Sequence, residues 1–192
     1  MTHQPTAGDV LHFWFGPPGE RGKPQKRWFF KDQAFDREIR ERFLPTYEQA
    51  AAGKLAHLKG KASDCLALIV MLDQFPRNMF RGTPRAFATD PLALEAARHA
   101  VAQGFDRAML PVERMFFYLP FEHSEALADQ LEACELNEAL DAYPETKDVY
   151  RYALAHRDII QRFGRFPHRN AILGRASTPE ELEFLKGPGS SF

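Results

Sequence analysis

The chain has 192 residues, of which 44% are hydrophobic and 27% are charged, an ordinary composition for a globular protein and a length that one compact domain accommodates. With 25 basic and 26 acidic side chains the formal net charge is −1, which excludes a broad positive field for nucleic acid or an anionic membrane surface. The longest fully apolar stretch, residues 65–72, is too short for a membrane helix, which needs about 20 residues.

The first residues, MTHQP, lack the basic start and apolar run of an export signal, which favours the cytoplasm. The two cysteines, Cys65 and Cys134, lie far apart within helical patterns, as expected for reduced structural thiols. No two histidines are three or four residues apart, and neither HExxH nor CxxC occurs. Glycine-rich phosphate loops are also absent, so we expect neither a metal nor a nucleotide cofactor.

Apolar residues recur with three- and four-residue spacing, and no two-residue alternation persists. This pattern predicts an all-α fold of about seven or eight helices stacked as hairpins. A short helix is expected around residues 9–15. Phe35, Ile39, Phe43 and Tyr47 mark the face of the next, with a bend or break at Pro45.

Two segments are apolar almost all round and are therefore expected to be central helices. The first covers residues 64–74 and is expected to end at Pro76, because the residue before a proline avoids helical backbone angles. The second covers about residues 111–119 and is expected to end at Pro120 for the same reason.

The remaining elements are also predicted to be helical. Asp90 and Pro91 supply an N-cap and a first-turn proline for a helix that Gly104 closes. The others are expected over 124–140, with Leu127, Leu131 and Cys134 on one face, over about 146–164, and from the capping box at Thr178 to Leu185. Residues 1–186 then form one domain, followed by a frayed tail over 187–192. Because no 34-residue period is visible, a solenoid would be an irregular, tetratricopeptide-like superhelix.

Two segments with a shared pattern follow predicted helices: Phe75-Pro76-Arg77-Asn78 and Phe166-Pro167-His168-Arg169-Asn170. They hold two of the three asparagines of the chain. In each, proline is expected to end a helix and release the next residues into an irregular turn. The predicted ligand-binding residues of these segments are Arg77, Asn78, His168, Arg169 and Asn170. The alternative is that the same side chains only cap helix ends.

Other polar residues interrupt the apolar segments, where burial of a polar or charged side chain is energetically unfavourable. Asp73 lies in the last turn of a buried helix, where it needs a cation, and Arg114 and Tyr118 lie four apart on the second buried helix. Glu122, His123 and Ser124 follow Pro120 and are expected at a helix N-terminus, where free N–H groups favour an anion. His156 lies on the apolar stripe of its helix. For each, a purely structural role is the alternative.

Four stretches resemble the bacterial family catalogued as domain of unknown function 924: VLHFWFG (10–16), LALIVMLDQFPRNMFRGTPRAFATD (66–90), FFYLPFEHSE (116–125) and AHRDIIQRFGRFPHRNAILGR (155–175). The resemblance runs through nearly the whole chain, and LDQFPRN is its most distinctive phrase. It implies an all-α, tetratricopeptide-like helical fold. Because the family has no established function, the resemblance marks no catalytic residue.

Two classes of function follow from these residues. In the first, Asp73, Arg77, Asn78, Arg114, Tyr118, His168, Arg169 and Asn170 bind a small phosphate- or carboxylate-bearing metabolite. His156 or His123 would then serve as the general acid or base of a hydrolysis or proton transfer. In the second, the chain is a non-enzymatic module whose arginines grip a peptide carboxylate. We favour the first, because the polar residues interrupt apolar segments instead of covering an exposed face.

Overall fold

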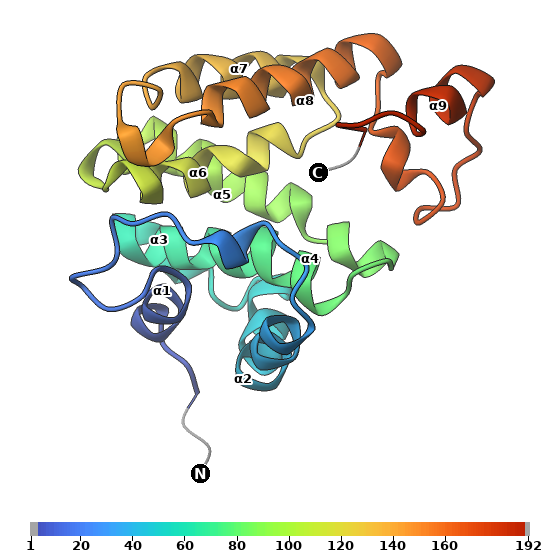
Figure 1. Cartoon of the computed structure of the whole chain (residues 1–192). Coiled ribbons are helices and arrows are strands. Elements are labelled where there is room, and N and C mark those ends of the chain that lie inside the picture. The colour runs from blue at the N-terminus through green and yellow to red at the C-terminus, as the bar shows by residue number, and fades with distance from the viewer. Residues whose placement is uncertain (1–3, 191–192) are drawn as a thin grey trace.

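A computed structural model of the protein describes residues 4–190. Within this range the chain forms helices only, connected by turns and short 3-10 segments (Figure 1). The all-α class predicted from the spacing of apolar residues is therefore confirmed. The α-helices are α1 (Ala7–Phe15), α2 (Gln33–Ala51), α3 (Ala62–Ile69), α4 (Phe75–Met79), α5 (Asp90–Ala102), α6 (Pro111–Glu122), α7 (Leu127–Glu138), α8 (Val149–Phe163) and α9 (Pro179–Phe184).

Helices α3 and α4 are two parts of one rod, which a π-helical turn at Val70–Gln74 connects. The expectation that Pro76 ends this helix is wrong. Proline has no N–H to donate to the carbonyl group of Leu72, four residues earlier, but the hydroxyl of Thr89 donates to that carbonyl instead. Because the lost hydrogen bond is replaced from α5, the helix continues through the proline to Met79.

Pro45 and Pro120 also lie inside helices, so the expected break at Pro45 and the expected end at Pro120 are wrong. In both helices, burial of the apolar face outweighs the roughly 3 kcal/mol by which an interior proline disfavours a helix. The consequence matters most at α6, which runs on to Glu122. His123 therefore caps the C-terminus of α6, and the prediction that it lies at a helix N-terminus is wrong. Helix α7 begins only at Leu127.

The helices lie in layers (Figure 1). Helices α7 and α8 pack on each other at one side of the molecule, and α6 packs between α7 and α5. The α3–α4 rod follows, in contact with α5, α1 and α2. Aromatic side chains from α1, the following loop and α6 fill the space between these layers, including Trp14, Trp28 and Phe116.

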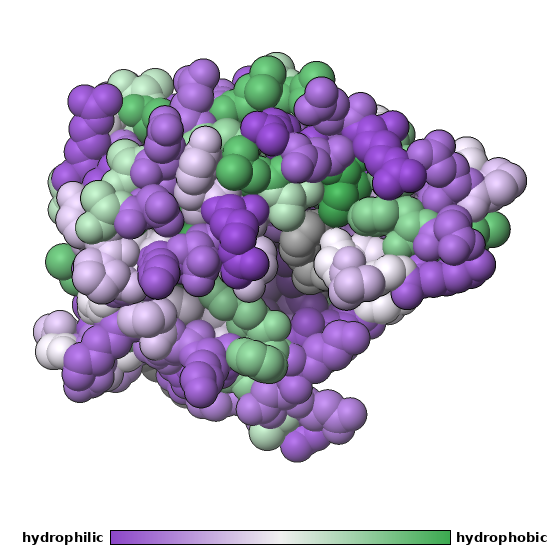
Figure 2. Space-filling model, turned by 45° about the horizontal axis from the view of Figure 1, so that its top comes forward, coloured by the Kyte–Doolittle hydropathy of each residue, from purple (hydrophilic) through white to green (hydrophobic). Residues whose placement is uncertain are grey.

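The buried face of α7 includes Cys134, as predicted, but neither of the two leucines expected beside it. Leu127 and Leu131 are 43% and 50% exposed, and Figure 2 shows a surface on which hydrophobic residues lie scattered among hydrophilic ones. Gln130 and Asn137 point inward instead. The amide of Gln130 donates to the carbonyl groups of Glu122 and Ser124, at 2.7 and 2.6 Å. Polar side chains are buried here because the end of α6 needs donors.

Two other helix starts agree with the sequence to within one residue. The N-cap of α5 is Thr89, and Asp90 is the first helical residue, which frees its carboxylate for another role. At α9, Thr178 Oγ1 accepts from the Glu181 N–H at 3.2 Å, as in the predicted capping box. In the predicted tail, Ser190 is buried and its hydroxyl donates to the carbonyl of Leu185. Residues 191–192 lie outside the described residues, and the domain boundary at 186 stays a prediction.

None of the helices between residues 4 and 190 combines the length and the apolar character that crossing a bilayer requires.

Candidate functional site

Charged and histidine side chains from six segments converge between the α3–α4 rod, the ends of α5 and α6, and α8. They include the two arginines of the repeated Phe-Pro segments, since both contact the carboxylate of Asp90. We refer to this group as the polar cluster. Its members are Asp73 from the π-helical turn, Arg77 from α4, Asp90 from α5, Glu122 and His123 from the end of α6, His156 from α8, and Arg169 from the turn Pro167–Arg169.

Asp73 is paired with the cation that its position requires. Its side chain is 1% exposed, and its Oδ1 lies 3.1 Å from Nη1 of Arg77. The same guanidinium binds Asp90 through two hydrogen bonds, of 2.8 and 2.9 Å. Burial alone would raise the pKa of Asp73, but Arg77 and His123 together lower it to about 2. Asp73 is therefore a buried, ionised carboxylate at neutral pH.

His123 is held in one orientation by this carboxylate. Its Nδ1 lies 2.7 Å from Oδ1 of Asp73, and an ionised carboxylate can only accept, so Nδ1–H is the donor. The proton-accepting lone pair is then on Nε2. Burial lowers the pKa of His123, and Arg77 lowers it further, against the opposite effect of Asp73. The imidazole is thus neutral near pH 7, with Nε2 in the form of a base.

Arg169 is buried but only partly paired. Its Nη1 donates to the carbonyl of His123 at 3.0 Å and lies 3.6 Å from Oδ2 of Asp90. Neither Nε, which is fully buried, nor Nη2 has a hydrogen-bond partner within residues 4–190. The rings of Phe87 and Phe166 flank the guanidinium, with their centroids 4.8 and 4.4 Å from Cζ. Burial lowers the pKa of Arg169 to about 10, with Arg77 acting in the same direction, so the group stays cationic near pH 7.

Glu122 and His156 lie behind His123, away from solvent. Glu122 Oε1 accepts from the amide of Asn137 at 2.9 Å, and its Oε2 lies 3.4 Å from Nδ1 of His156. Burial raises the pKa of Glu122 to about 8, so this carboxyl is mostly protonated at neutral pH. His156 Nδ1 also lies 2.8 Å from the carbonyl of Tyr152, and burial lowers the pKa of His156 to about 3. Both groups are therefore neutral near pH 7.

The polar cluster is open to solvent on one side. The side chains of Arg77 and Asp90 are each 18% exposed, and that of His123 is 13% exposed. His168 stands beside Arg169 and packs its ring against Phe166 at 5.6 Å between centroids. Burial, followed by Arg169, lowers the pKa of His168 to about 4. A ligand approaching from solvent would meet these side chains first.

The two asparagines of the repeated segments are not brought into the polar cluster. The Asn78 amide donates to the carbonyl of Gln74, and its oxygen accepts from Arg81 at 2.8 Å. The Asn170 amide donates to Ser177, and its oxygen accepts from Arg175 at 2.9 Å. Both amides are occupied in fixing local chain turns, and their assignment as ligand-binding residues stays a prediction.

Arg114 and Tyr118 belong to a different network. Arg114 donates to the Tyr118 hydroxyl at 3.3 Å, and that hydroxyl donates to Asp106 at 2.7 Å. The charge that interrupts the apolar pattern of α6 thus contacts a tyrosine of the same helix, which in turn binds Asp106 in the 3-10 turn before the helix. No hydrogen bond or ion pair joins these three residues to the polar cluster within the described part of the chain.

Sequence reasoning missed two members of the site. Asp90 bridges Arg77 and Arg169, but it was assigned only as a helix cap. The signal was present, because Thr89 and Asp90 are two capping residues in succession and one helix needs only one N-cap. The guanidiniums of Arg77 and Arg169 both lie over the ring of Phe87. Nothing in the sequence indicated this contact, because an aromatic residue in a turn is usually explained by packing against the hydrophobic core.

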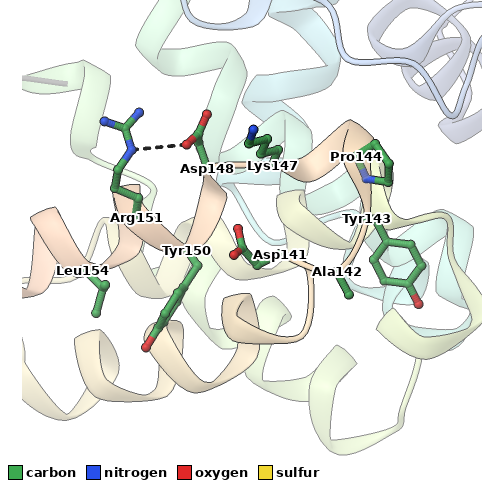
Figure 3. A pocket seen from close by; sticks show the side chains of 9 residues that line it. All are labelled: Asp141, Ala142, Tyr143, Pro144, Lys147, Asp148, Tyr150, Arg151 and Leu154. Atoms are coloured by element: carbon green, nitrogen blue, oxygen red, sulfur yellow. Dashed lines mark ion pairs between the residues drawn. The ribbon is translucent and has the colours of Figure 1, made fainter.

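Two cavities of the structure lie elsewhere. A cavity of about 430 Å³ lies at the turn between α7 and α8, and Figure 3 shows Asp148 and Arg151 paired with each other there. A second, of about 500 Å³, adjoins Arg21 and Glu113, which also form an ion pair. Arg21 also has a buried Nε without a hydrogen-bond partner, but its charge is paired with that of Glu113, and neither cavity adjoins the polar cluster. Within residues 4–190, no three His, Cys, Asp or Glu side chains converge as metal ligands would.

Comparison with known proteins agrees with the fold and assigns no activity. The model of the family described as "Bacterial protein of unknown function (DUF924)" matches residues 10–189. A solved structure of a protein of unknown function from Agrobacterium tumefaciens is similar at 46% sequence identity with a TM-score of 0.84, over 94% of this chain and 97% of that one. No curated protein matches.

Proposed function

This chain belongs to the DUF924 family of bacterial proteins of unknown function, and we propose that it binds a small anionic metabolite at the polar cluster, with His123 placed for acid or base chemistry. The observation that carries the proposal is the unpaired side of the Arg169 guanidinium. Arg169 is 6% exposed, and a buried donor without an acceptor costs about 1–3 kcal/mol. An anion bound there would satisfy it.

The geometry of the guanidinium supports an anion with two oxygen atoms. Nε–H and Nη2–H of an arginine point in parallel and match the two oxygens of a carboxylate or phosphate group. In Arg169 these are the two nitrogens without a hydrogen-bond partner among the described residues, whereas Nη1 is used by His123 and Asp90. Arg77 is already bound by two carboxylates, so its role is to hold Asp73 and Asp90 in place.

The arrangement of His123 supports a role in proton transfer. A carboxylate on Nδ1 fixes the tautomer and the ring orientation, and leaves Nε2 to accept a proton. His123 lies against Arg169, because its own carbonyl accepts from Nη1. Of the two histidines predicted from the sequence, His123 is the better candidate. His156 stands behind it with Nδ1 against a backbone carbonyl.

A small molecule is favoured over a peptide because the unpaired donor is buried and flanked by aromatic rings. A peptide-binding module would present its arginines along an open groove. The tetratricopeptide-like superhelix on which the peptide alternative depends stays a prediction.

A thermal-shift screen against carboxylated and phosphorylated metabolites tests the proposal. A ligand present at 100 times its dissociation constant is expected to stabilise the protein by about 2.7 kcal/mol. The variant Arg169→Lys keeps the charge but removes the paired N–H groups, so the stabilisation should fall sharply while the protein still folds. Arg162→Ala is the matched control, because Arg162 pairs with Glu180 on the exposed surface nearby.

A screen without any stabilising metabolite would count against the proposal. So would a hit that stabilises Arg169→Lys as much as the unmodified protein, because its binding would then lie elsewhere.

A further inference from the structure

We propose that the anionic group bound by Arg169 is a singly charged carboxylate and not a phosphate dianion. This rests on the proposed function and names the chemical class of the ligand. Three features of the site carry it: the pair of donors on Arg169 that no carboxylate neutralises, the balance of charges around them, and the two aromatic rings in contact with the guanidinium.

Arg169 offers one pair of donors that no carboxylate neutralises. Of the two guanidiniums in the cluster, Arg77 is bound by Asp73 and by both oxygens of Asp90. In Arg169, by contrast, neither Nε–H nor Nη2–H has an acceptor within the described residues, and Nε is fully buried. One parallel pair of donors satisfies a carboxylate completely. A phosphate group has a third anionic oxygen, for which the structure supplies no further cation.

The charges around these donors are already balanced. Arg77 and Arg169 carry two positive charges, and Asp73 and Asp90 carry two negative ones. Glu125 also lies close, since it accepts from the Phe166 N–H at 2.8 Å, but Arg175 neutralises it through two hydrogen bonds. Each charge on the ligand is therefore an excess charge. A dianion would bring two such charges close to Asp90, and like charges held out of water repel strongly.

The rings favour a flat group. The guanidinium of Arg169 lies over the rings of Phe87 and Phe166, so an anion bound to its nitrogens lies near the rings as well. All atoms of a carboxylate fit in the guanidinium plane. A tetrahedral phosphate places oxygen atoms above and below it, where they would meet the negative faces of the rings.

Acetate and sulfate provide the test, since neither changes its charge near neutral pH. Each is titrated at matched ionic strength into the full chain, and binding is followed through the NMR signal of Arg169 Nε–Hε, assigned by its loss in Arg169→Lys. We expect acetate to bind more tightly than sulfate, with a dissociation constant at least about tenfold lower. In Asp90→Asn, which removes one negative charge, the sulfate affinity should rise more than the acetate affinity.

Sulfate that binds as tightly as acetate, or tighter, would overturn the inference. A phosphorylated metabolite that stabilises the protein and loses its effect in Arg169→Lys would also overturn it, while leaving the proposed anion site intact. If neither probe moves the Arg169 signal and the metabolite screen is empty as well, both proposals fail. Arg162→Ala should leave both titrations unchanged.

Discussion

Replacing Asp73 by alanine is expected to destabilise the fold by about 3–5 kcal/mol, the usual effect of removing one partner of a buried ion pair. Asp73 neutralises Arg77, accepts from Nδ1 of His123 and accepts from the side chain of Gln74. All three donors would lose an acceptor in the interior. Chemical denaturation, monitored by circular dichroism, measures the change.

Two further variants separate the contribution of this carboxylate from a general effect of losing an aspartate. Asp158→Ala removes an exposed carboxylate that pairs only with neighbouring Arg157, and a change below about 0.5 kcal/mol is expected. Asp73→Asn keeps the size of the side chain and should fall between the two. A loss below about 1 kcal/mol in Asp73→Ala would contradict the view that Asp73 organises the cluster.

Glu122→Gln is expected to stabilise the protein by about 3–4 kcal/mol at pH 8. The pKa of Glu122 is raised to about 8 in the folded state, mainly by burial, from its ordinary value of 4.5. Folding therefore favours the protonated carboxyl. The resulting stability is fully present below pH 4.5 and is lost as the pH rises toward 8. Glutamine is never ionised, so the variant should not show this loss.

The pH range of the measurement matters because His156 acts in the opposite direction. Its pKa is lowered to about 3 by burial, so only the unfolded state takes up its proton between about pH 3 and 6.5, and stability rises with pH there. Burial also lowers the pKa values of His123 and His168 below 6.5, so these two histidines act in the same direction as His156, and the three effects fade only above about pH 7.5. The histidine contributions are common to both proteins, so between pH 6.5 and 8 the free energy of unfolding of the unmodified protein should fall relative to that of Glu122→Gln. The control is Glu183→Gln, since Glu183 is exposed beside Lys186; parallel slopes in all three proteins would contradict the assignment.

The helical class and most helix positions follow from the spacing of apolar residues, but the ends at prolines do not. Local preference predicts a break at Pro45, Pro76 and Pro120, whereas all three lie within helical segments. At Pro76 the reason is a hydroxyl from α5, which replaces the missing hydrogen bond at Leu72. A contact between segments 17 residues apart is not visible in local sequence.

The convergence of Arg77 and Arg169 follows from the repeated Phe-Pro pattern, although the structural reason differs from the predicted one. Pro167 does begin a turn after α8, but Pro76 lies inside a helical rod. The directions of the asparagine side chains were beyond sequence reasoning, because they depend on which arginine binds each amide. Arg81 and Arg175 supply those contacts.

A crystal structure of the protein with the metabolite identified by the screen tests the central claim most directly. We expect two oxygens of the ligand at about 2.7–2.9 Å from Nε and Nη2 of Arg169, with His123 Nε2 facing the bound molecule. A ligand bound in the cavity between α7 and α8, with the Arg169 nitrogens still unpaired, would contradict the account.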